Sequence, residues 1–365
     1  MFLSETQAQV RDMARQFADE VIRPMAEELD RDERFPAEIY DQMAELGLFG
    51  IGVPEEMGGP GFDTVTYAVV MEELSRGYAS VADQCGLIEL ISTLLVRHGT
   101  DAQRDRWLAD VRAARTLCAY CITEPEAGTG VSGIRTTAVR DGDGWVLNGA
   151  KCVVRNAGQA DVLIVAARAG AGIGLFKVES GAKGLSLQDY PTIDGGRAAE
   201  IVLDGVAAVC LAEDGAGVLE RVLGRGVLAL CAEAVGIMDV IKDMTVEYTR
   251  TRKQFGVPIG KFQALQHRMA EMLLEVEQAR SSVIKAAFHE GDAGVARERA
   301  ISAAKVTIGR VGTLVTEETI QIHGGMAMTW EYPVGHFAKR LTMIGTELGD
   351  EDYHLRRYIA LGRTA

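Results

Sequence analysis

EYTRTRKQFGVPIGKFQALQHRMAEM, residues 247–272, is the stretch from which the rest of this chain is interpreted. It predicts the end of one helix, a rigid connector, and a second helix that starts at Phe262. Pro258 fixes its own φ angle, while Gly256 and Gly260 permit tight turns, so the connector leaves the chain little freedom. We expect the residues just before the connector to be held at a helix end.

Three side chains at that helix end suit a ligand. Arg252 offers a fixed cation, Gln254 an amide and Phe255 an aromatic ring. Together they favour a ligand that carries phosphate and a flat ring. An ordinary helical hairpin with surface charge explains the same residues, so the chemistry alone leaves both interpretations open.

A resemblance decides between them. The run RKQFGVPIGKFQALQ resembles the flavin-binding motif of the acyl-CoA dehydrogenase family. TEPEAGTG at Thr123–Gly130 is similar to that family's TEP-x-AGSD segment, and QIHGGMAMTWEYPV at Gln321–Val334 is similar to its Q-x-x-GG-x-G segment. The motifs occur in the family's order and spacing, and the likeness covers nearly the whole chain.

Composition limits the partners. The 365 residues are 47% hydrophobic, which is enough for a large core and two or three domains. The chain has 38 basic and 52 acidic residues, a net charge of -14, which disfavours nucleic acid and anionic membranes as partners. A local basic cluster can still bind an anionic cofactor such as a coenzyme A ester.

The N-terminus and the apolar runs indicate the compartment. MFLSETQAQV predicts a helical capping box, with Ser4 as N-cap and Gln7 as its partner, and has no signal-peptide layout. No apolar run reaches the length of a membrane span. We therefore expect a cytoplasmic protein.

Six cysteines lie among apolar neighbours, as is typical of reduced, buried thiols. Cys118 and Cys121 form a CxxC pair in CAYCIT, a predicted strand. Residues three apart in a strand point to opposite faces, so we expect core packing and no shared metal. No histidine pair has metal-ligand spacing with a third donor, although His267 and His323 are plausible cofactor neighbours.

Periodicity predicts an α+β chain of three domains. Residues 1–116 form an N-terminal helical domain, in which Pro24 ends or bends the first helix. Residues 117–213 hold strand-like runs joined by Asp-Gly and Gly-rich turns, which indicate an antiparallel sandwich or barrel. Residues 214–365 hold four long apolar-faced helices that favour a bundle, followed by a short terminal helix. The resemblance implies the same domain order.

The resemblance also implies FAD, lying between the β domain and the bundle, with its adenine end reaching a neighbouring subunit. By motif position, Tyr120, Ile122 and Thr123 would line the isoalloxazine ring. The diphosphate and adenosine would be bound across a dimer interface by Arg252, Gln254, Phe255, Gln263, Gln321, Gly324 and Gly325. We therefore expect an obligate dimer or a dimer of dimers.

Several positions depart from the family pattern. Thr129 and Arg135 would border the thioester channel, with Thr129 in place of a usual Ser and Gly130 in place of a usual Asp. The family's K-x-W-I-T/S-N segment places Val153 where a ring-stacking Trp is usual, and Arg155 where a small hydroxyl faces the flavin. Arg155 could pair with a substrate carboxylate, favour an anionic reduced flavin, or be a solvated strand-end side chain.

The catalytic base is missing from its usual positions. Desaturation of a thioester needs a carboxylate that removes the α-proton while hydride leaves Cβ for the flavin. The family places that Glu after the fourth bundle helix, in a Glu-Gly pair, or on the first bundle helix. Here the first position is Leu348, followed by Gly349, and the second is Gly226. Neither side chain can accept a proton.

Three interpretations remain. Glu347 or Asp350 could move into the site from a shifted loop. Alternatively, a homologous partner subunit provides the base; the likeness of LALCAEAVG and GDEDYHL to pimeloyl-CoA dehydrogenase-like small subunits supports this. Thirdly, the protein binds flavin without this chemistry.

We expect an FAD-dependent acyl-CoA dehydrogenase that converts an acyl-CoA to its α,β-enoyl form. We expect it to pass electrons to an electron-transfer flavoprotein or similar acceptor, as a homo-oligomer or a heterotetramer.

Overall fold

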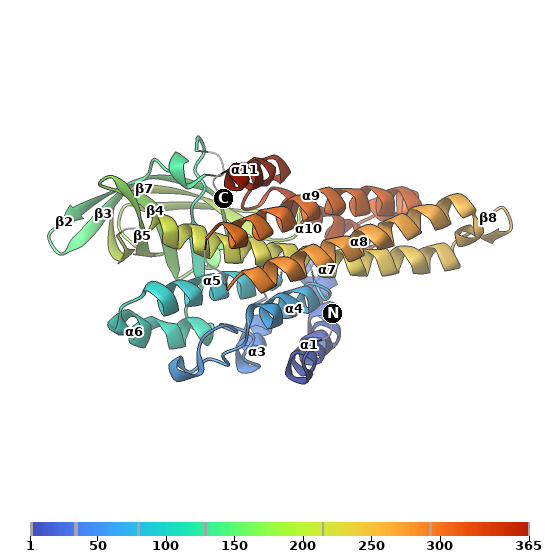
Figure 1. Cartoon of the computed structure of the whole chain (residues 1–365), viewed down its shortest axis with the longest axis horizontal. Helices are drawn as coiled ribbons and strands as arrows, with labels where there is room; N and C mark the ends of the chain where they lie inside the picture. The colour runs from blue at the N-terminus through green and yellow to red at the C-terminus, as the bar shows by residue number, and fades with distance from the viewer. Residues whose placement is uncertain are drawn as a thin grey trace.

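The computed structural model describes residues 3–32, 36–78, 81–127, 130–213, 215–291 and 294–363. The molecule is elongated, with a β domain at one end and long helices running towards the other (Figure 1). The N-terminal helices cover one side of these long helices. This order of helices, strands and helices confirms the predicted fold class.

The N-terminal part is wholly helical in its described residues. Ser4 and Gln7 form the predicted capping box. Pro24 does not end the first helix: a π-helical stretch, Ala18–Ile22, precedes it, and the helix then continues as α2. A widened turn accommodates the proline, which has no N–H to donate. The helices are α1 Glu5–Phe17, α2 Arg23–Asp32, α3 Ala37–Glu45, α4 Thr64–Leu74, α5 Ala82–His98 and α6 Asp101–Arg112.

The middle part is one seven-stranded sheet. Its strands are β1 Cys118–Cys121, β2 Thr137–Asp141, β3 Gly144–Arg155, β4 Val162–Ala169, β5 Gly172–Glu179, β6 Leu185–Pro191 and β7 Arg197–Ala212. Five of them close a ring in the order β4-β2-β3-β7-β5 and back to β4, so the barrel is the right choice over the sandwich. The sheet is not purely antiparallel, because β1 and β2 both pair with β4 in parallel.

The two cysteines of CAYC lie on opposite faces of β1, as predicted. Cys118 packs into the core shared by the helices, and Cys121 packs into the core enclosed by the sheet. Both are free, buried thiols. The strand therefore separates the two cores.

The C-terminal part contains the four predicted bundle helices, α7 Ala216–Thr251, α8 Gln263–His289, α9 Val295–His323 and α10 Val334–Thr346, followed by α11 Glu351–Arg363. The hairpin β8 Lys253–Gln254 and β9 Val257–Pro258 joins α7 to α8 at the far end from the sheet (Figure 1). The unbroken α7 packs against α4, α5, α8, α9 and α10, so it is the central element of the molecule. No described helix is long and apolar enough to cross a membrane.

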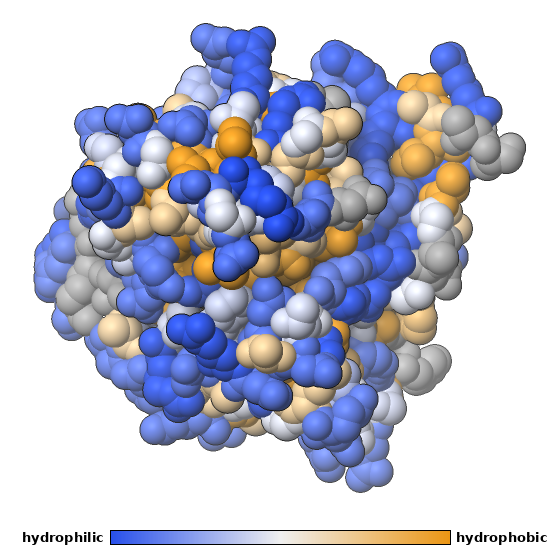
Figure 2. All heavy atoms as spheres, turned by 90° about the vertical axis from the view of Figure 1, so that its left-hand side faces the viewer, coloured by the Kyte–Doolittle hydropathy of each residue, from blue (hydrophilic) through white to orange (hydrophobic). Residues whose placement is uncertain are grey.

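The end of the molecule that carries the sheet has a mostly hydrophilic surface, with apolar residues gathered near the middle of the view (Figure 2). Val139 and Val209, both on strands, are exposed there on the β domain. Most of the aliphatic side chains of the strands are buried instead, in the core that the sheet encloses.

Candidate active site

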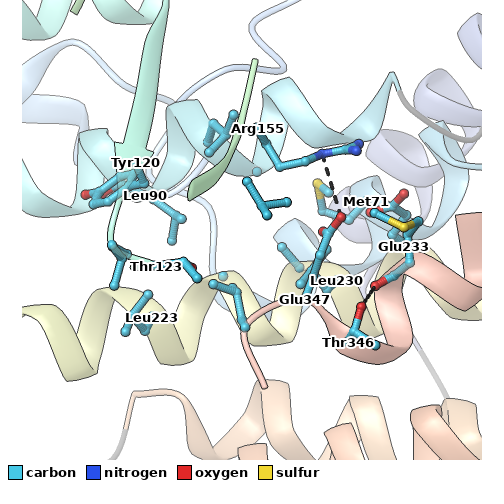
Figure 3. A pocket seen from close by; sticks show the side chains of 18 of the residues that line it. Met71, Leu90, Tyr120, Thr123, Arg155, Leu223, Leu230, Glu233, Thr346 and Glu347 are labelled. Carbon is cyan, nitrogen blue, oxygen red and sulfur yellow. Dashed lines mark hydrogen bonds and ion pairs between the residues drawn. The ribbon is translucent and has the colours of Figure 1, made fainter. Parts of the chain in front are cut away.

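A cavity of about 330 Å³ lies where all three parts of the chain meet (Figure 3). Leu87 and Leu90 of α5 form one wall, and the end of α10 forms another. The rest of the lining comes from the β1 end, β3 and α7: Tyr120, Ile122, Thr123, Val153, Arg155, Leu223, Gly226, Ala229, Leu230 and Glu233. Its size and largely apolar lining are typical of small-molecule sites.

The structure brings several predicted residues together here. Tyr120 is held in place because its hydroxyl donates to the Leu90 carbonyl at 3.4 Å. Ile122, Thr123, Val153 and Arg155 line the same cavity. Val153 has a positive φ of 51°, a conformation that non-glycine residues adopt mainly where the surroundings impose it.

The two usual base positions face each other across this cavity. Both Gly226 and Leu348 line it. A Cβ atom added to Gly226 would lie 3.0 Å from Leu348 Cδ1 and 3.2 Å from Leu90 Cδ1. The leucine side chain therefore packs closely against Gly226, and the pair forms an apolar contact where the resemblance places a carboxylate.

The loop that carries Leu348 is firmly held. Leu348 itself has a φ of 52°. The buried Lys305 ammonium donates to the carbonyls of Ile344 at 2.8 Å and Gly349 at 2.7 Å, and also to Gly345 at 3.1 Å. His354 Nε2 lies 3.0 Å from the Leu348 carbonyl. These contacts argue against the predicted movement of a neighbouring acid into the site.

Burial shifts the pKa of both groups that hold this loop. It lowers the pKa of Lys305, and it lowers the pKa of His354 to about 4. His354 is thus neutral at pH 7, and its Nε2 hydrogen can be donated to the carbonyl.

A buried charge cluster closes one end of the cavity. Arg340, fully buried, donates to both oxygens of Glu233, at 2.6 and 2.9 Å, and to Glu347 at 2.8 Å. It also donates to Asp194 at 2.9 Å, which lies on the turn between β6 and β7. Arg155 pairs with Asp194 at 3.1 Å and with Glu347 at 3.6 Å (Figure 3).

Sequence reasoning missed Asp194, Glu233 and Arg340. Their contacts link positions 146 residues apart in the chain, which one sequence cannot reveal. The one available signal is that Glu233 follows Gly226 by two helical turns, so both lie on the same face of α7.

The structure separates the two predicted acids. Glu347 lines the cavity, and its side chain is 16% exposed. Burial would raise the pKa of Glu347, but the guanidinium groups of Arg340 and Arg155 outweigh that effect and hold it below its ordinary value. Asp350 is exposed and outside the cavity lining; its carboxylate accepts from the Tyr353 amide at 2.8 Å and caps α11. The structure therefore argues against Asp350 as a base.

The residues predicted to bind the phosphates, Arg252, Gln254 and Phe255, lie at the end of α7 that is far from the cavity. We call this group the corner. Phe255 and Gly256 have positive φ angles of 53° and 81°, as expected for the two-residue turn of the β8–β9 hairpin. Phe255 is 92% exposed, and Arg252 is exposed as well. Among the described residues no ion pair engages Arg252. Gln254, Gln263, Gln321, Gly324 and Gly325 are also exposed.

The corner lies far from the cavity within one chain. Arg252 follows Glu233 by nineteen positions on a continuous helix. At about 1.5 Å per residue they are roughly 28 Å apart along its axis.

A second, wider cavity of about 660 Å³ adjoins the first and shares Gly130, Val131 and Leu223 with it. The cationic side chains of Arg168 and Arg357 line it, as do the first residues of α7. Glu220 and Glu298 line it too, and both pair with Arg357 at 2.6 Å, so what the cavity offers an anionic ligand is chiefly the N-terminus of α7.

The remaining predicted substrate residues are not placed in either cavity. Thr129 lies outside the described residues. Arg135 is exposed and pairs with Glu126. Its backbone N–H donates to Glu124 at 2.7 Å, and Glu124 in turn pairs with the buried Lys151 at 2.6 Å. That buried ion pair, missed from the sequence, holds the segment after β1 against β3.

Comparison with known proteins identifies the family. Family models for the acyl-CoA dehydrogenase N-terminal, middle and C-terminal domains match residues 4–115, 119–206 and 213–360. The probable acyl-CoA dehydrogenase YngJ of Bacillus subtilis is 33% identical over 98% of this chain and 97% of its own length. The chain belongs to the acyl-CoA dehydrogenase family.

Solved acyl-CoA dehydrogenase relatives share the whole architecture. A glutaryl-CoA dehydrogenase in complex with glutaryl-CoA is 30% identical, with a TM-score of 0.94, over 100% of this chain and 96% of that one. A glutaryl-CoA dehydrogenase from Mycobacterium smegmatis in complex with FADH2 is 25% identical, with a TM-score of 0.92, over 99% of this chain and 95% of that one. The chain is thus an FAD-dependent oxidoreductase that acts on the CH–CH bond of acyl-CoA thioesters.

The residues present fit FAD, the cofactor of acyl-CoA dehydrogenases. The cavity beside Tyr120 to Thr123 is apolar and bordered by strand ends, which suits a flat ring system. The exposed guanidinium of Arg252 and the side-chain-free Gly324 and Gly325 suit the diphosphate.

Proposed function

We propose that this chain performs acyl-CoA desaturation as one subunit of a two-chain enzyme, in which a homologous partner supplies the carboxylate that removes the α-proton. The observation that carries this proposal is the contact between Leu348 and Gly226, where a Cβ on the glycine would lie 3.0 Å from the leucine. Both base positions are apolar and complementary in shape. The loop is pinned, and the acid next to Leu348, Glu347, is paired with Arg340 at 2.8 Å.

In such an assembly, the corner at the end of α7 would bind the cofactor of the neighbouring chain. When bound, FAD accepts a hydride from the acyl group. Arg252 and Gln254 would hold the diphosphate and adenosine of a cofactor whose ring lies in the neighbouring chain, because their own cavity is roughly 28 Å away. The exposed Phe255 would be covered by that neighbour.

The two adjoining cavities account for the substrate. The wide cavity, which the N-terminus of α7 borders, would hold the coenzyme A portion, and the apolar cavity would hold the acyl group. Leu223, which lines both, lies at the junction where the thioester would pass.

We extend the proposal to the acceptor and the compartment. An electron-transfer flavoprotein would reoxidise the flavin, as the family resemblance implies. The six cysteines are free thiols, which supports a reducing compartment such as the cytoplasm.

One observation favours a second candidate, in which Glu347 accepts the proton within its own chain. Glu347 lines the cavity, and both of its pairing arginines reach the same oxygen, Oε1. Its lowered pKa keeps it ionised, but a base with a pKa far below the working pH has little driving force to take a proton.

Anaerobic mixing of the purified chain with acyl-CoA separates the two candidates. The two-chain proposal expects a yellow protein whose flavin absorbance does not bleach until the homologous companion chain is added. Bleaching by the chain alone, abolished in Glu347→Gln, would instead establish Glu347 as the base. The variant Glu56→Gln, on an exposed loop, controls for the loss of one surface charge.

A further inference from the structure

The hydroxyl of Tyr67 is buried without a hydrogen bond. Tyr67 lies on α4 and is fully buried, and its hydroxyl oxygen has no hydrogen-bond partner in the part of the chain that the structure describes. Burial raises the pKa of Tyr67 well above its ordinary value, so the hydroxyl stays protonated and can donate. Because an unpaired buried hydroxyl is unfavourable, its presence in a native protein calls for an explanation.

The charged groups around the Tyr67 ring are paired with one another. The Arg225 guanidinium lies 5.0 Å from the ring centroid. Arg225 is buried, and it donates to Glu89 at 3.0 Å and to Glu290 at 3.1 Å. This network fixes the face of the ring and leaves the hydroxyl unpaired at a defined place.

The Tyr67 hydroxyl lies beside the acyl cavity. Met71 of α4, Gly86 of α5 and Ala229 of α7 all line that cavity. A Cβ atom added to Gly86 would lie 3.7 Å from Met71 Cε, 3.7 Å from Ala229 Cβ and 3.9 Å from the Tyr67 hydroxyl oxygen. The hydroxyl therefore borders the space in front of Gly86, together with two side chains of the cavity wall.

Packing does not require a glycine at position 86. Glycine inside a helix is unfavourable relative to alanine, and a close neighbour is a common reason to find one there. Here a Cβ on Gly86 would meet its nearest neighbours only in ordinary van der Waals contact. The effect of the glycine is to leave open the space beside the hydroxyl. Met71, with its flexible side chain, can yield to a ligand atom in that space.

The place of this space along the cavity indicates which acyl carbon would meet the hydroxyl. Ala229 follows Gly226, one of the two usual base positions, by three residues on α7. At about 1.5 Å per residue it lies roughly 5 Å deeper, which is about three or four carbons of an extended chain beyond the α-carbon. In Figure 3 Met71 likewise lies on the side of Glu233, away from Leu223.

We propose that Tyr67 determines acyl specificity, by donating a hydrogen bond to an acceptor oxygen, such as that of a ketone, on the fifth or sixth carbon of the acyl group. The proposal rests on the proposed function, in which this cavity holds the acyl group. Met71 and Ala229 offer no donor, so a carbonyl buried there without Tyr67 would be unfavourable. Tyr67 thus lets an apolar cavity accept an oxygen-bearing acyl group.

Isothermal titration of the purified FAD-containing chain tests the proposal with two pairs of esters. The first pair is 5-oxohexanoyl-CoA and 5-methylhexanoyl-CoA, and the second is 6-oxoheptanoyl-CoA and 6-methylheptanoyl-CoA. Within each pair a methyl group replaces the oxygen at nearly the same size. Tyr67→Phe removes only the hydroxyl. It should weaken binding of the oxo ester about five- to tenfold in at least one pair, and change binding of the methyl ester by less than about twofold.

Two further measurements exclude a structural role for the hydroxyl. Because it has no partner within the described chain, Tyr67→Phe should keep or raise the denaturant midpoint of unfolding. A structural role would instead lower the midpoint and weaken both esters of a pair alike. Tyr358→Phe, at a half-buried position of α11 outside the lining of both cavities, is the matched control and should keep the wild-type affinities.

The outcomes separate this proposal from the one before it. Unchanged binding of both oxo esters in Tyr67→Phe overturns it, as does an equal loss for the oxo and methyl esters, or failure of all four esters to bind the wild-type chain. None of these results decides which chain supplies the base. Bleaching of the flavin by a methyl ester without a companion chain would refute the two-chain function, and the same Tyr67 comparison would then be made on the rates of bleaching.

Discussion

Leu348 occupies a position that decides whether this chain has a catalytic base of its own. Its φ of 52° is unfavourable for a bulky side chain by on the order of 1–2 kcal/mol. The sequence alone identified positions 348 and 226 as lacking an acid, by counting from the motifs. It could not show that their side chains meet, because the contact joins the end of α10 to the middle of α7.

We predict that Leu348→Glu makes the isolated chain able to oxidise an acyl-CoA. The new carboxylate would enter a largely apolar cavity, which raises its pKa towards the working range. The rate of anaerobic flavin bleaching should rise by about 100-fold or more, a typical contribution of a general base. Leu348→Gln has the same shape and cannot ionise, so equal bleaching by both variants would contradict the prediction.

At the scale of elements, the end of α10 is held by α9 and α11. Lys305 on α9 and His354 on α11 both bond carbonyls of residues 344–349. Helices α9 and α10 are two of the four apolar-faced helices predicted for residues 214–365. The polar contacts between them were not predictable, because a lysine in a helical pattern is normally expected at the surface.

The pKa of His354 predicts a pH dependence of stability. The folded chain resists protonation of His354 until about pH 4, whereas the unfolded chain protonates near 6.5. Below that pH the unfolded state binds more protons, so this contribution to stability is complete above pH 6.5 and is lost as the pH falls towards 4. The loss amounts to roughly 3 kcal/mol.

Urea unfolding at a series of pH values measures this effect. His354→Gln should be less stable than the wild type at pH 7 but should lose less stability between pH 6.5 and pH 4. His267→Gln, at an exposed position of α8, should retain the wild-type slope. A parallel slope in His354→Gln and the wild type would refute the assignment.

Strand β6 shows a different limit of sequence reasoning. LSLQDYP was not predicted as a strand, because its residues are mostly half-buried or exposed and it pairs only with β7. It lacks the continuous run of buried residues found in β4 and β5. Such a strand is recognisable only from its partner.

At the scale of the whole molecule, Arg340 ties the β domain to the bundle. It bonds Asp194 on the sheet side and Glu233 and Glu347 on the helical side. We predict that Arg340→Met destabilises the chain by about 3–5 kcal/mol, because it leaves buried carboxylates without their cation. Arg356→Met is the control, because Arg356 is 80% exposed and pairs with Asp352 at the surface. Its free energy of unfolding should change by less than about 0.5 kcal/mol. Denaturant midpoints would measure both.

The distance between cavity and corner predicts how FAD is held. Arg252→Ala should lower the bound flavin per chain by at least about tenfold in the assembled protein, since a charge-assisted phosphate contact is lost. The assembly size and the acyl cavity should be unaffected. Arg250→Ala, two residues earlier and 72% exposed, should keep its flavin. Absorbance per chain after gel filtration gives the answer, and full flavin retention in Arg252→Ala would remove the corner from the cofactor site.

The motif residues around Arg252, Tyr120 and Gln321 were found from the sequence because the family fixes their spacing. The charges behind the cavity were not, because Asp194, Glu233 and Arg340 come from three separate elements and no motif joins them. The fold was thus predictable from local patterns, and the buried charge cluster required the packed structure.

The backbone around Leu348 has an evolutionary consequence. Lys305 and His354 hold the backbone at Leu348 in a left-handed conformation, which is unfavourable for leucine. Gly349 follows Leu348 in the sequence. Because Lys305 and His354 bond backbone carbonyls, they would hold the same bend for another side chain at position 348. A gene copy relieved of dependence on its companion could therefore regain independent turnover through substitution at a single codon.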